Sequence, residues 1–279
     1  MDGGMSPTEA ARALLAFWRA AGVDMDEAEA IYAGTAPIRP PAGPAPGAPP
    51  KAGPRLKRPP PSAEAPVETA RALAAAAQTI GELHSAVERF EGCALKATAR
   101  NTAFCDGVIG APVLLLGEAP GKEEDEQGKP FVGRSGQLLD RMLAQIGLSR
   151  QSNILISNTI YWRPPGKRDP TQGEIVACLP FVERLIELAQ PKLLVLTGKA
   201  AAHTVLKRED GVMKLRGRRL FYNREGLGAA VNAMVMLHPA YLLRQPQHKR
   251  LAWADLLSAE AWLKELGVDT QGASAIVKI

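Results

Sequence analysis

Four short apolar runs constrain the fold of this chain more than any other feature of its sequence. They are Val113–Leu116, Ile154–Ile156, Leu193–Leu196 and Ala233–Leu237. Each run has the length of a strand and is apolar at every position, which is typical of a strand that is buried on both faces. Because helical patterns separate the runs, the sequence predicts a parallel sheet that is covered by helices on both sides.

The segments between the runs carry the period and the start signals of helices. We expect helices over residues 67–88, 135–146, 171–189 and 200–206. Thr171 and Glu174 have the spacing of a capping box at the start of the third of these helices. The expected fold class is a three-layer α/β/α sandwich around a four-stranded, mainly parallel sheet.

The two ends of the chain differ from this pattern. Residues 1–33 contain short helical stretches and predict a small helical extension. Residues 34–66 are rich in proline, alanine and glycine and contain no aromatic residue, so we interpret them as a flexible linker. The sequence therefore predicts a globular domain over residues 67–266 and a C-terminal tail over residues 267–279.

The composition of the chain bears on its partners and on the compartment in which it acts. The 34 Lys and Arg residues outnumber the 29 Asp and Glu residues, and the net charge of +5 permits a polyanionic partner without requiring one. Three scattered cysteines are too few for a disulfide framework, which favours a reducing compartment. The sequence has no signal-peptide pattern and no apolar run of the ~18 residues that a membrane span needs. We expect a cytoplasmic monomer with no membrane partner.

Polar residues follow three of the four runs. Glu118 lies just after the first run, Asn158 after the second and His238 after the fourth. In open α/β sheets, ligands bind beyond the carboxyl ends of the strands, so these side chains are expected to converge on one rim. Each has an ordinary structural explanation when taken alone, because a glutamate can cap a turn and a histidine before proline is usually structural. Their joint occurrence favours a functional site.

Three longer motifs surround these residues in order. They are GEAPGKEEDEQGKPFVGRSG over residues 117–136, Asn158 with Arg163-Pro164-Pro165 and Arg168-Asp169-Pro170, and the run His238-Pro239-Ala240-Tyr241-Leu242-Leu243-Arg244. Together they closely resemble the signatures of family 4 uracil-DNA glycosylases, over residues 90–257. The resemblance implies that the partner is DNA containing uracil and that the reaction is hydrolytic removal of the base.

The resemblance also implies roles for individual residues at the site. Glu118, with the adjacent backbone at Ala119 as a substrate contact, would hold the attacking water and favour the cationic sugar. His238 would donate a hydrogen bond to uracil O2 as the base leaves. Phe131 would stack on the flipped base, and Asn158 would pair with its O4 and N3–H.

Further residues are expected to contact DNA. Leu242 and Leu243 form an apolar wedge suited to the stack that the flipped base vacates, and Arg244 beside them suits a phosphate. Ser135, at a helix start, is a second candidate phosphate contact. Arg168 is a further candidate, although charge in such a loop is usually solvated.

The cysteines depart from the family pattern. Family 4 enzymes typically hold a four-iron four-sulfur cluster with four cysteines. Here Cys93 and Cys178 match two ligand positions, whereas Phe90 and Trp162 replace the other two. Because two thiolates cannot supply this ligation, we expect no iron-sulfur cofactor and no metal. Cys178 also lies on the apolar stripe of its predicted helix, which favours a core position.

The expected function is that of a monofunctional DNA N-glycosylase, which flips uracil out of DNA, hydrolyses the N-glycosidic bond and so starts base excision repair. Two alternatives stay open. A pocket reshaped by loss of the cluster would accept other deaminated bases, such as hypoxanthine or xanthine. A catalytically weak protein that only binds damaged DNA would use the same fold for recognition.

Overall fold

The computed structural model describes residues 64–224 and 228–270. The helical extension predicted over residues 1–33 lies outside the described residues, as do residues 34–63 of the predicted linker and residues 271–279 of the predicted tail. All described residues belong to one compact unit of the chain.

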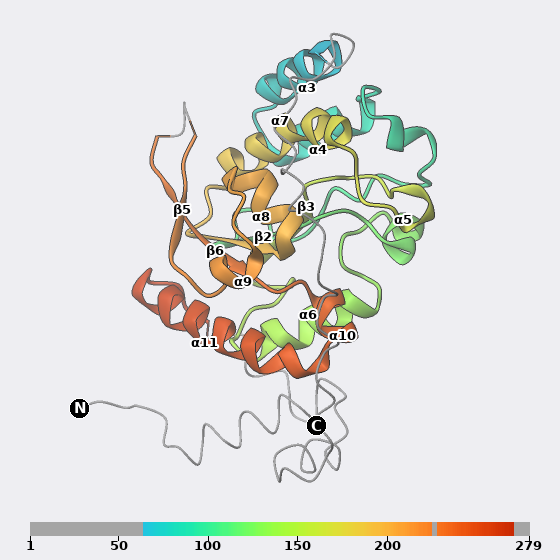
Figure 1. The fold of residues 1–279 in the computed structure, drawn as a ribbon. Helices are drawn as coiled ribbons and strands as arrows, with labels where there is room; N and C mark the ends of the chain where they lie inside the picture. Colours follow the sequence, from blue (N-terminus) through green and yellow to red (C-terminus); the bar gives the residue numbers. More distant parts are fainter. Residues whose placement is uncertain (1–63, 225–227, 271–279) are drawn as a thin grey trace, which may run out of the picture. The chain divides into compact units, whose positions relative to one another are not determined.

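A six-stranded sheet forms the middle layer of this unit (Figure 1). The strands are β1 (Cys105–Gly107), β2 (Val113–Gly117), β3 (Ile154–Asn158), β4 (Leu193–Thr197), β5 (Leu220–Tyr222) and β6 (Val231–Met236). Their order across the sheet is β1-β3-β2-β4-β6-β5. The four central strands contain the four apolar runs, except for Leu237, which follows β6, and they pair in parallel, as predicted.

The predicted number of four strands is wrong, because β1 and β5 add an antiparallel edge on each side. Both edge strands are three residues long. Cys105 and Asp106 of β1 are only partly buried, and Phe221 at the centre of β5 is exposed. An edge strand that is not buried on both faces needs no continuous apolar run, so the pattern that identified the central strands could not detect it.

Nine α-helices lie in the described part of the chain. They are α3 (Glu64–Ala76), α4 (Ile80–Arg89), α5 (Lys122–Gln127), α6 (Arg134–Ala144), α7 (Gln172–Ala189), α8 (Gly198–Leu206), α9 (Val212–Leu215), α10 (Pro239–Arg244) and α11 (Lys249–Glu265). Short 3₁₀ turns cover Ala94–Ala97, Pro165–Lys167 and Pro246–His248.

Two helix starts show how local sequence sets these bounds. The Thr171–Glu174 capping box is present as predicted, with the Thr171 amide donating to Glu174 at 2.7 Å. The single helix predicted over residues 67–88 is instead two helices. Its second half restarts at Thr79, whose side chain accepts a hydrogen bond from the Glu82 amide at 3.1 Å.

The predicted three-layer arrangement is confirmed. Figure 1 shows α3, α4, α7 and α8 over one face of the sheet and α6 and α11 over the other. Successive residues of a strand point to opposite faces, and Leu114 and Leu116 belong to the same hydrophobic cluster as Phe181 and Leu185 of α7. Burial on both faces explains why β2 is apolar along its whole length.

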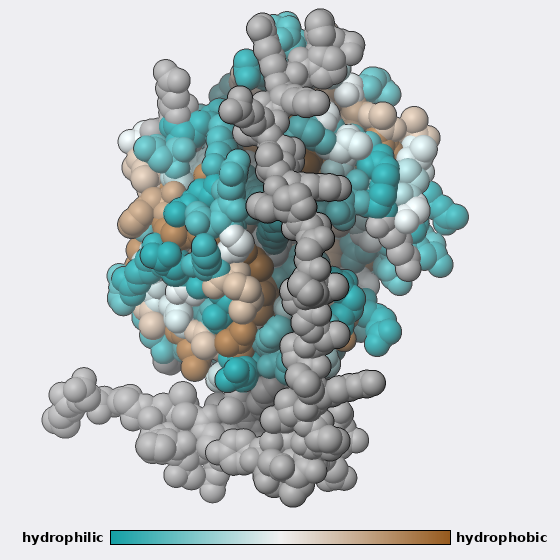
Figure 2. Space-filling view, in the orientation of Figure 1, coloured by the Kyte–Doolittle hydropathy of each residue, from teal (hydrophilic) through white to brown (hydrophobic). Residues whose placement is uncertain are grey.

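The surface of the described residues is mainly hydrophilic on the face that Figure 2 shows, with smaller apolar groups between the polar ones. The large apolar side chains exposed in the described part are Ile109, Met213, Phe221 and Leu243. Of these, only Leu243 belongs to a motif of the candidate site. None of the described helices has the length and apolar character needed to cross a membrane.

Candidate active site

The polar groups that follow the strands meet at one edge of the sheet. Glu118 follows β2, Asn158 ends β3, and His238 begins α10 after β6. The parallel pairing of β3, β2, β4 and β6 brings these strand ends to the same edge. β4, between β2 and β6, is followed by Gly198, where a Cβ atom would lie 3.0 Å from the Cβ of His238. The lack of a side chain there gives His238 its space.

An aromatic residue and an amide lie over the end of β2. The ring centroids of Phe131 and His238 are 5.5 Å apart, with the ring planes inclined by 30°. A Cβ atom on Gly117 would lie 2.4 Å from Asn158 Oδ1 and 2.5 Å from Phe131 Cζ. The Phe131 ring therefore lies next to His238 and shares the space over Gly117 with Asn158 Oδ1, and the lack of a side chain at position 117 leaves that space free.

Asn158 is buried at the end of β3. Among the described residues, none forms a hydrogen bond with its side-chain amide; the backbone carbonyl of Asn158 is the group that accepts from Ser157 Oγ. The amide is therefore available to a ligand that presents a complementary edge.

His238 is held as a neutral donor. Its Nδ1 accepts a hydrogen bond from the Ala240 amide at 3.1 Å, which leaves the ring proton on Nε2. Burial, with a smaller contribution from the nearby charge of Arg244, lowers the pKa of His238 to about 4. At neutral pH the imidazole is thus uncharged, and its Nε2–H can donate to an oxygen that develops negative charge.

Glu118 is fixed through its backbone and perturbed at its carboxyl group. Its carbonyl accepts hydrogen bonds from the Ile160 amide and the Thr159 hydroxyl, both at 2.9 Å, which tie it to the chain after β3. Burial raises the pKa of Glu118, and the negative charge of Asp169 raises it further. Ala119 beside it is partly buried against the core. The carboxylate thus lies in an environment that favours neutralisation of its charge, for example by a cationic ligand.

Two residues that the sequence did not identify hold the loop that carries Phe131. The Glu124 carboxylate accepts hydrogen bonds from the amides of Gly121, Val132 and Gly133 at 3.0, 2.9 and 2.9 Å. Arg150 donates to the carbonyls of Pro130 and Phe131. Glu124 was part of a motif without an assigned role. Arg150 lay in no motif, and no local signal links it to a loop about 20 residues away in the sequence.

The expected DNA contacts divide into exposed and buried residues. Leu243 is 36 % exposed and Arg244 is exposed, whereas Leu242 is fully buried. Of the two leucines expected to form the wedge, only Leu243 reaches the surface in this structure, and Leu242 belongs to the core. The helix α10 packs its Leu242 side inward, towards α6, because one face of even a short helix must cover the core.

The other two expected contacts have different surroundings. Ser135 lies in the first turn of α6 and is partly exposed. The guanidinium of Arg168 donates to both carboxylate oxygens of Glu174, at 2.9 and 2.6 Å. This bidentate pair lowers the pKa of Glu174 and ties the loop to the start of α7. Arg168 thus has a role inside the protein that its loop position did not predict.

The four positions at which family 4 enzymes hold a cluster gather in the core. The rings of Phe90 and Trp162 have centroids 6.5 Å apart, and Phe181 packs edge-on against Phe90 at 5.1 Å. Cys93 and Cys178 lie close enough that a hydrogen bond between their thiols lowers the pKa of Cys93, and this bond together with burial raises that of Cys178. Two aromatic rings and two thiols do not fit a four-cysteine cluster. Within residues 64–224 and 228–270, no group of three or more His, Cys, Asp or Glu side chains is arranged to hold a metal ion.

Comparison with known proteins identifies the family. The family model described as the Uracil DNA glycosylase superfamily matches residues 104–257. The type-4 uracil-DNA glycosylase of Pyrobaculum aerophilum is 32% identical over 169 residues, which are 59% of this chain and 85% of that protein. The enzymes with the same name from Saccharolobus solfataricus and Archaeoglobus fulgidus are 34% and 36% identical, over 61% and 56% of this chain and 79% and 78% of their own lengths. The chain therefore belongs to the uracil-DNA glycosylase superfamily.

Proposed function

We propose that this protein is a DNA N-glycosylase that removes uracil hydrolytically and leaves an abasic site, which starts base excision repair. The observation that carries the proposal is the Phe131 ring, which lies over Gly117 with Asn158 Oδ1 and 5.5 Å from the His238 ring, at the strand edge that also carries Glu118. The name that three similar proteins share, type-4 uracil-DNA glycosylase, supports the same reaction.

Recognition follows from the buried amide and the ring. A uracil that has left the duplex stacks on Phe131 and presents its Watson–Crick edge to Asn158. The amide oxygen accepts from N3–H and the amide nitrogen donates to O4. Cytosine has a donor at position 4 and an acceptor at N3, so the same amide orientation opposes it twice. Asn158 thereby selects uracil.

Bond cleavage separates charge, and the two remaining groups lower the cost of that separation. As the bond between C1′ and the base breaks, the electron pair goes to uracil and the sugar becomes cationic. The neutral His238 donates from Nε2 to O2 of the departing base, while the Glu118 carboxylate favours the sugar cation and orients the attacking water. Water oxygen bonds to C1′, and its proton is released. The DNA strand stays intact.

Exposed residues near His238 suit the DNA backbone. Leu243 is positioned to fill the space that the flipped base leaves, and Arg244 to contact a phosphate. Ser135, in the first turn of α6, is the second phosphate contact in this proposal.

The deciding experiment incubates the full-length protein with oligonucleotides that carry uracil, hypoxanthine, xanthine or a thymine mismatch. We expect release of uracil and a much slower reaction with the other bases. Comparable release of hypoxanthine would favour a broader deaminated-base glycosylase, and tight binding without release would favour a damage-binding protein. The matched variant is Asn158→Asp, which keeps the side-chain size but removes the donor to O4, so its uracil excision should be strongly impaired.

We also propose that the activity needs no iron-sulfur cluster and that the active species is a monomer. The packing of Phe90 against Phe181 and Trp162 supports the first part, because aromatic packing supplies the stability that a cluster would otherwise give to this region. Iron and acid-labile sulfide analysis of anaerobically purified protein tests it. Near-stoichiometric iron and sulfide would contradict this proposal while leaving the one on uracil excision intact. Light scattering of the active fraction tests the monomer.

A further inference from the structure

We propose that Arg150 is a positioning residue of the uracil pocket, which acts by holding the loop that presents the ring of Phe131. This inference rests on the proposed function. It concerns a residue outside the sequence motifs, on the segment between α6 and β3.

Phe131 has a backbone conformation that requires support. Its φ of 54° lies in the left-handed region, which is unfavourable for a bulky residue. Its carbonyl is also approached closely by the start of α6, since a Cβ atom on Gly136 would lie 1.8 Å from the Phe131 oxygen. The ring points to His238 only while this conformation persists, so groups that hold the Phe131 peptide control the pocket.

Two charged side chains bind the backbone of this loop: Arg150 binds its carbonyls and Glu124 binds its amides. Arg150 Nη1 donates to the Pro130 carbonyl at 2.8 Å, and Nη2 donates to the Phe131 carbonyl. Glu124 accepts from the next two amides, those of Val132 and Gly133. Four consecutive residues of the loop are thus fixed, with carbonyls bound by a cation and amides bound by an anion. Charge-assisted bonds of this kind are stronger and shorter than neutral ones.

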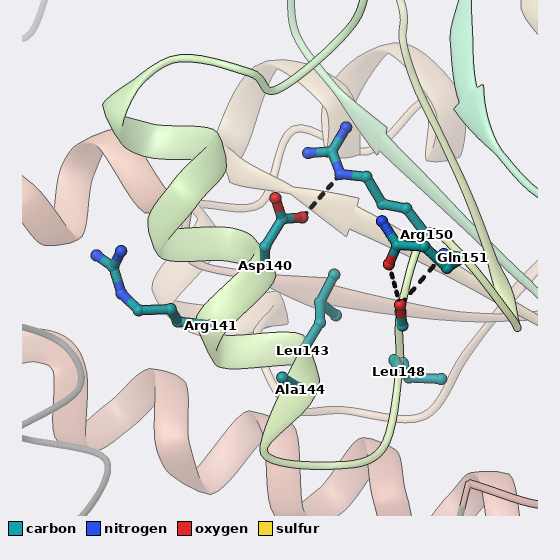
Figure 3. A pocket seen from close by; sticks show the side chains of 8 residues that line it. Asp140, Arg141, Leu143, Ala144, Leu148, Arg150 and Gln151 are labelled. Carbon is teal, nitrogen blue, oxygen red and sulfur yellow. Dashed lines mark hydrogen bonds and ion pairs between the residues drawn. The ribbon is translucent and has the colours of Figure 1, made fainter. Parts of the chain in front are cut away.

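Arg150 is itself held in place by two carboxylates. Its Nε donates to Asp140 of α6 at 2.8 Å, and its Nη1 lies 3.0 Å from Asp106 of the edge strand β1. Figure 3 shows Asp140 directed at the Arg150 guanidinium beside a cavity of about 300 Å³ that both residues line. Only 9 % of the Arg150 side chain is exposed. A neutralised, nearly buried guanidinium with fixed anchors is a rigid support for the loop.

A purely structural role for Arg150 predicts a different result from a positioning role. The test is a double-mutant cycle between Arg150→Lys and Phe131→Ala in the full-length protein. Lysine keeps the charge but lacks the planar fork that reaches both carbonyls. We expect Arg150→Lys to lower kcat/KM for uracil excision by about tenfold to a hundredfold, as displacement of a substrate-positioning group does. In the Phe131→Ala background, where no ring remains to be positioned, the same change should cost less than about twofold.

Arg216 supplies the matched control. It donates to both oxygens of the buried Asp255 and to the Leu251 carbonyl, which is similar chemistry in another part of the fold. Arg216→Lys should lower the Tm without lowering kcat/KM, and its effect should be independent of Phe131→Ala.

A milder variant covers the case in which Arg150→Lys fails to fold. Asp140→Ala removes one anchor of Arg150, at a side chain that is 46 % exposed, and its smaller effect on kcat/KM should also vanish in the Phe131→Ala background. Equal effects in the presence and absence of the Phe131 ring would overturn the inference while leaving the proposed function intact. Absence of uracil excision by the wild-type protein would overturn both.

Discussion

The glycine at the end of β2 offers the most direct test of the pocket. In Gly117→Ala the new methyl group would lie 2.4 Å from Asn158 Oδ1 and 2.5 Å from Phe131 Cζ, whereas ordinary contacts begin at 3.4 Å. Both side chains must therefore move by about 1 Å, and a displacement of this size in a substrate-positioning group can reduce the rate by ~10²-fold. We expect such a loss in kcat/KM for uracil excision, because one methyl group displaces both the Phe131 ring, on which the base stacks, and the Asn158 amide, which recognises its edge.

The assay is single-turnover release of uracil from a labelled oligonucleotide, with thermal unfolding measured on the same samples. Gly173→Ala is the control, because a Cβ atom there meets nothing within 4 Å and the residue lies in α7. That change should leave the rate unaltered and stabilise the helix by about 0.5–1 kcal/mol. A wild-type rate in Gly117→Ala would refute the reasoning, since it would mean that neither Asn158 nor Phe131 needs its present position. A large fall in Tm would instead attribute the loss to unfolding.

Three further outcomes follow from the site and the bounds of the fold. His238→Ala should reduce the single-turnover rate by ~10²-fold with near-normal thermal unfolding, because it removes one donor to the departing base; a wild-type rate would exclude that role. Excision should fall as the pH falls through the raised pKa of Glu118, because the carboxylate is the active form, and Asp169→Asn should shift this acid limb of the pH–rate profile to lower pH by removing one cause of the rise. If the acid limb of the pH–rate profile does not move in Asp169→Asn, the group that titrates there is not Glu118. Removal of residues 1–63, which precede α3, should retain most of the activity and the cooperative unfolding transition; loss of either would show that this segment contributes to the domain.

The identity of the central sheet and the place of the site were readable from the sequence. Each of β2, β3, β4 and β6 contains an uninterrupted apolar run, which is typical of a strand buried on both faces, so the sequence identified these strands without any knowledge of their partners. Parallel strands then necessarily bring their carboxyl ends to one edge. The placement of Asn158 and His238 at this one edge was therefore predictable, and so was the capping box at Thr171, which depends on residues three apart.

Leu242 and Leu243 mark where this kind of reasoning stops. Both are leucines in one motif, yet Leu242 is fully buried and Leu243 is 36 % exposed. The orientation of α10 against α6 decides which of them faces solvent, and adjacent positions of a helix point in different directions. A motif identifies the segment but not the face that it presents.

Tertiary structure alone determined the polar support of the pocket. Arg150 reaches carbonyls 19 and 20 residues before it and a carboxylate 44 residues before it, on an edge strand with no apolar run. Apolar periodicity records how deeply each residue is buried, because burial acts on every side chain separately. A hydrogen bond between distant groups depends on how whole elements pack, so it leaves no periodic pattern in the residues around either partner. The chain's own sequence thus determined the sheet and the rim, and only packing decided which charged side chains hold the Phe131 loop in place.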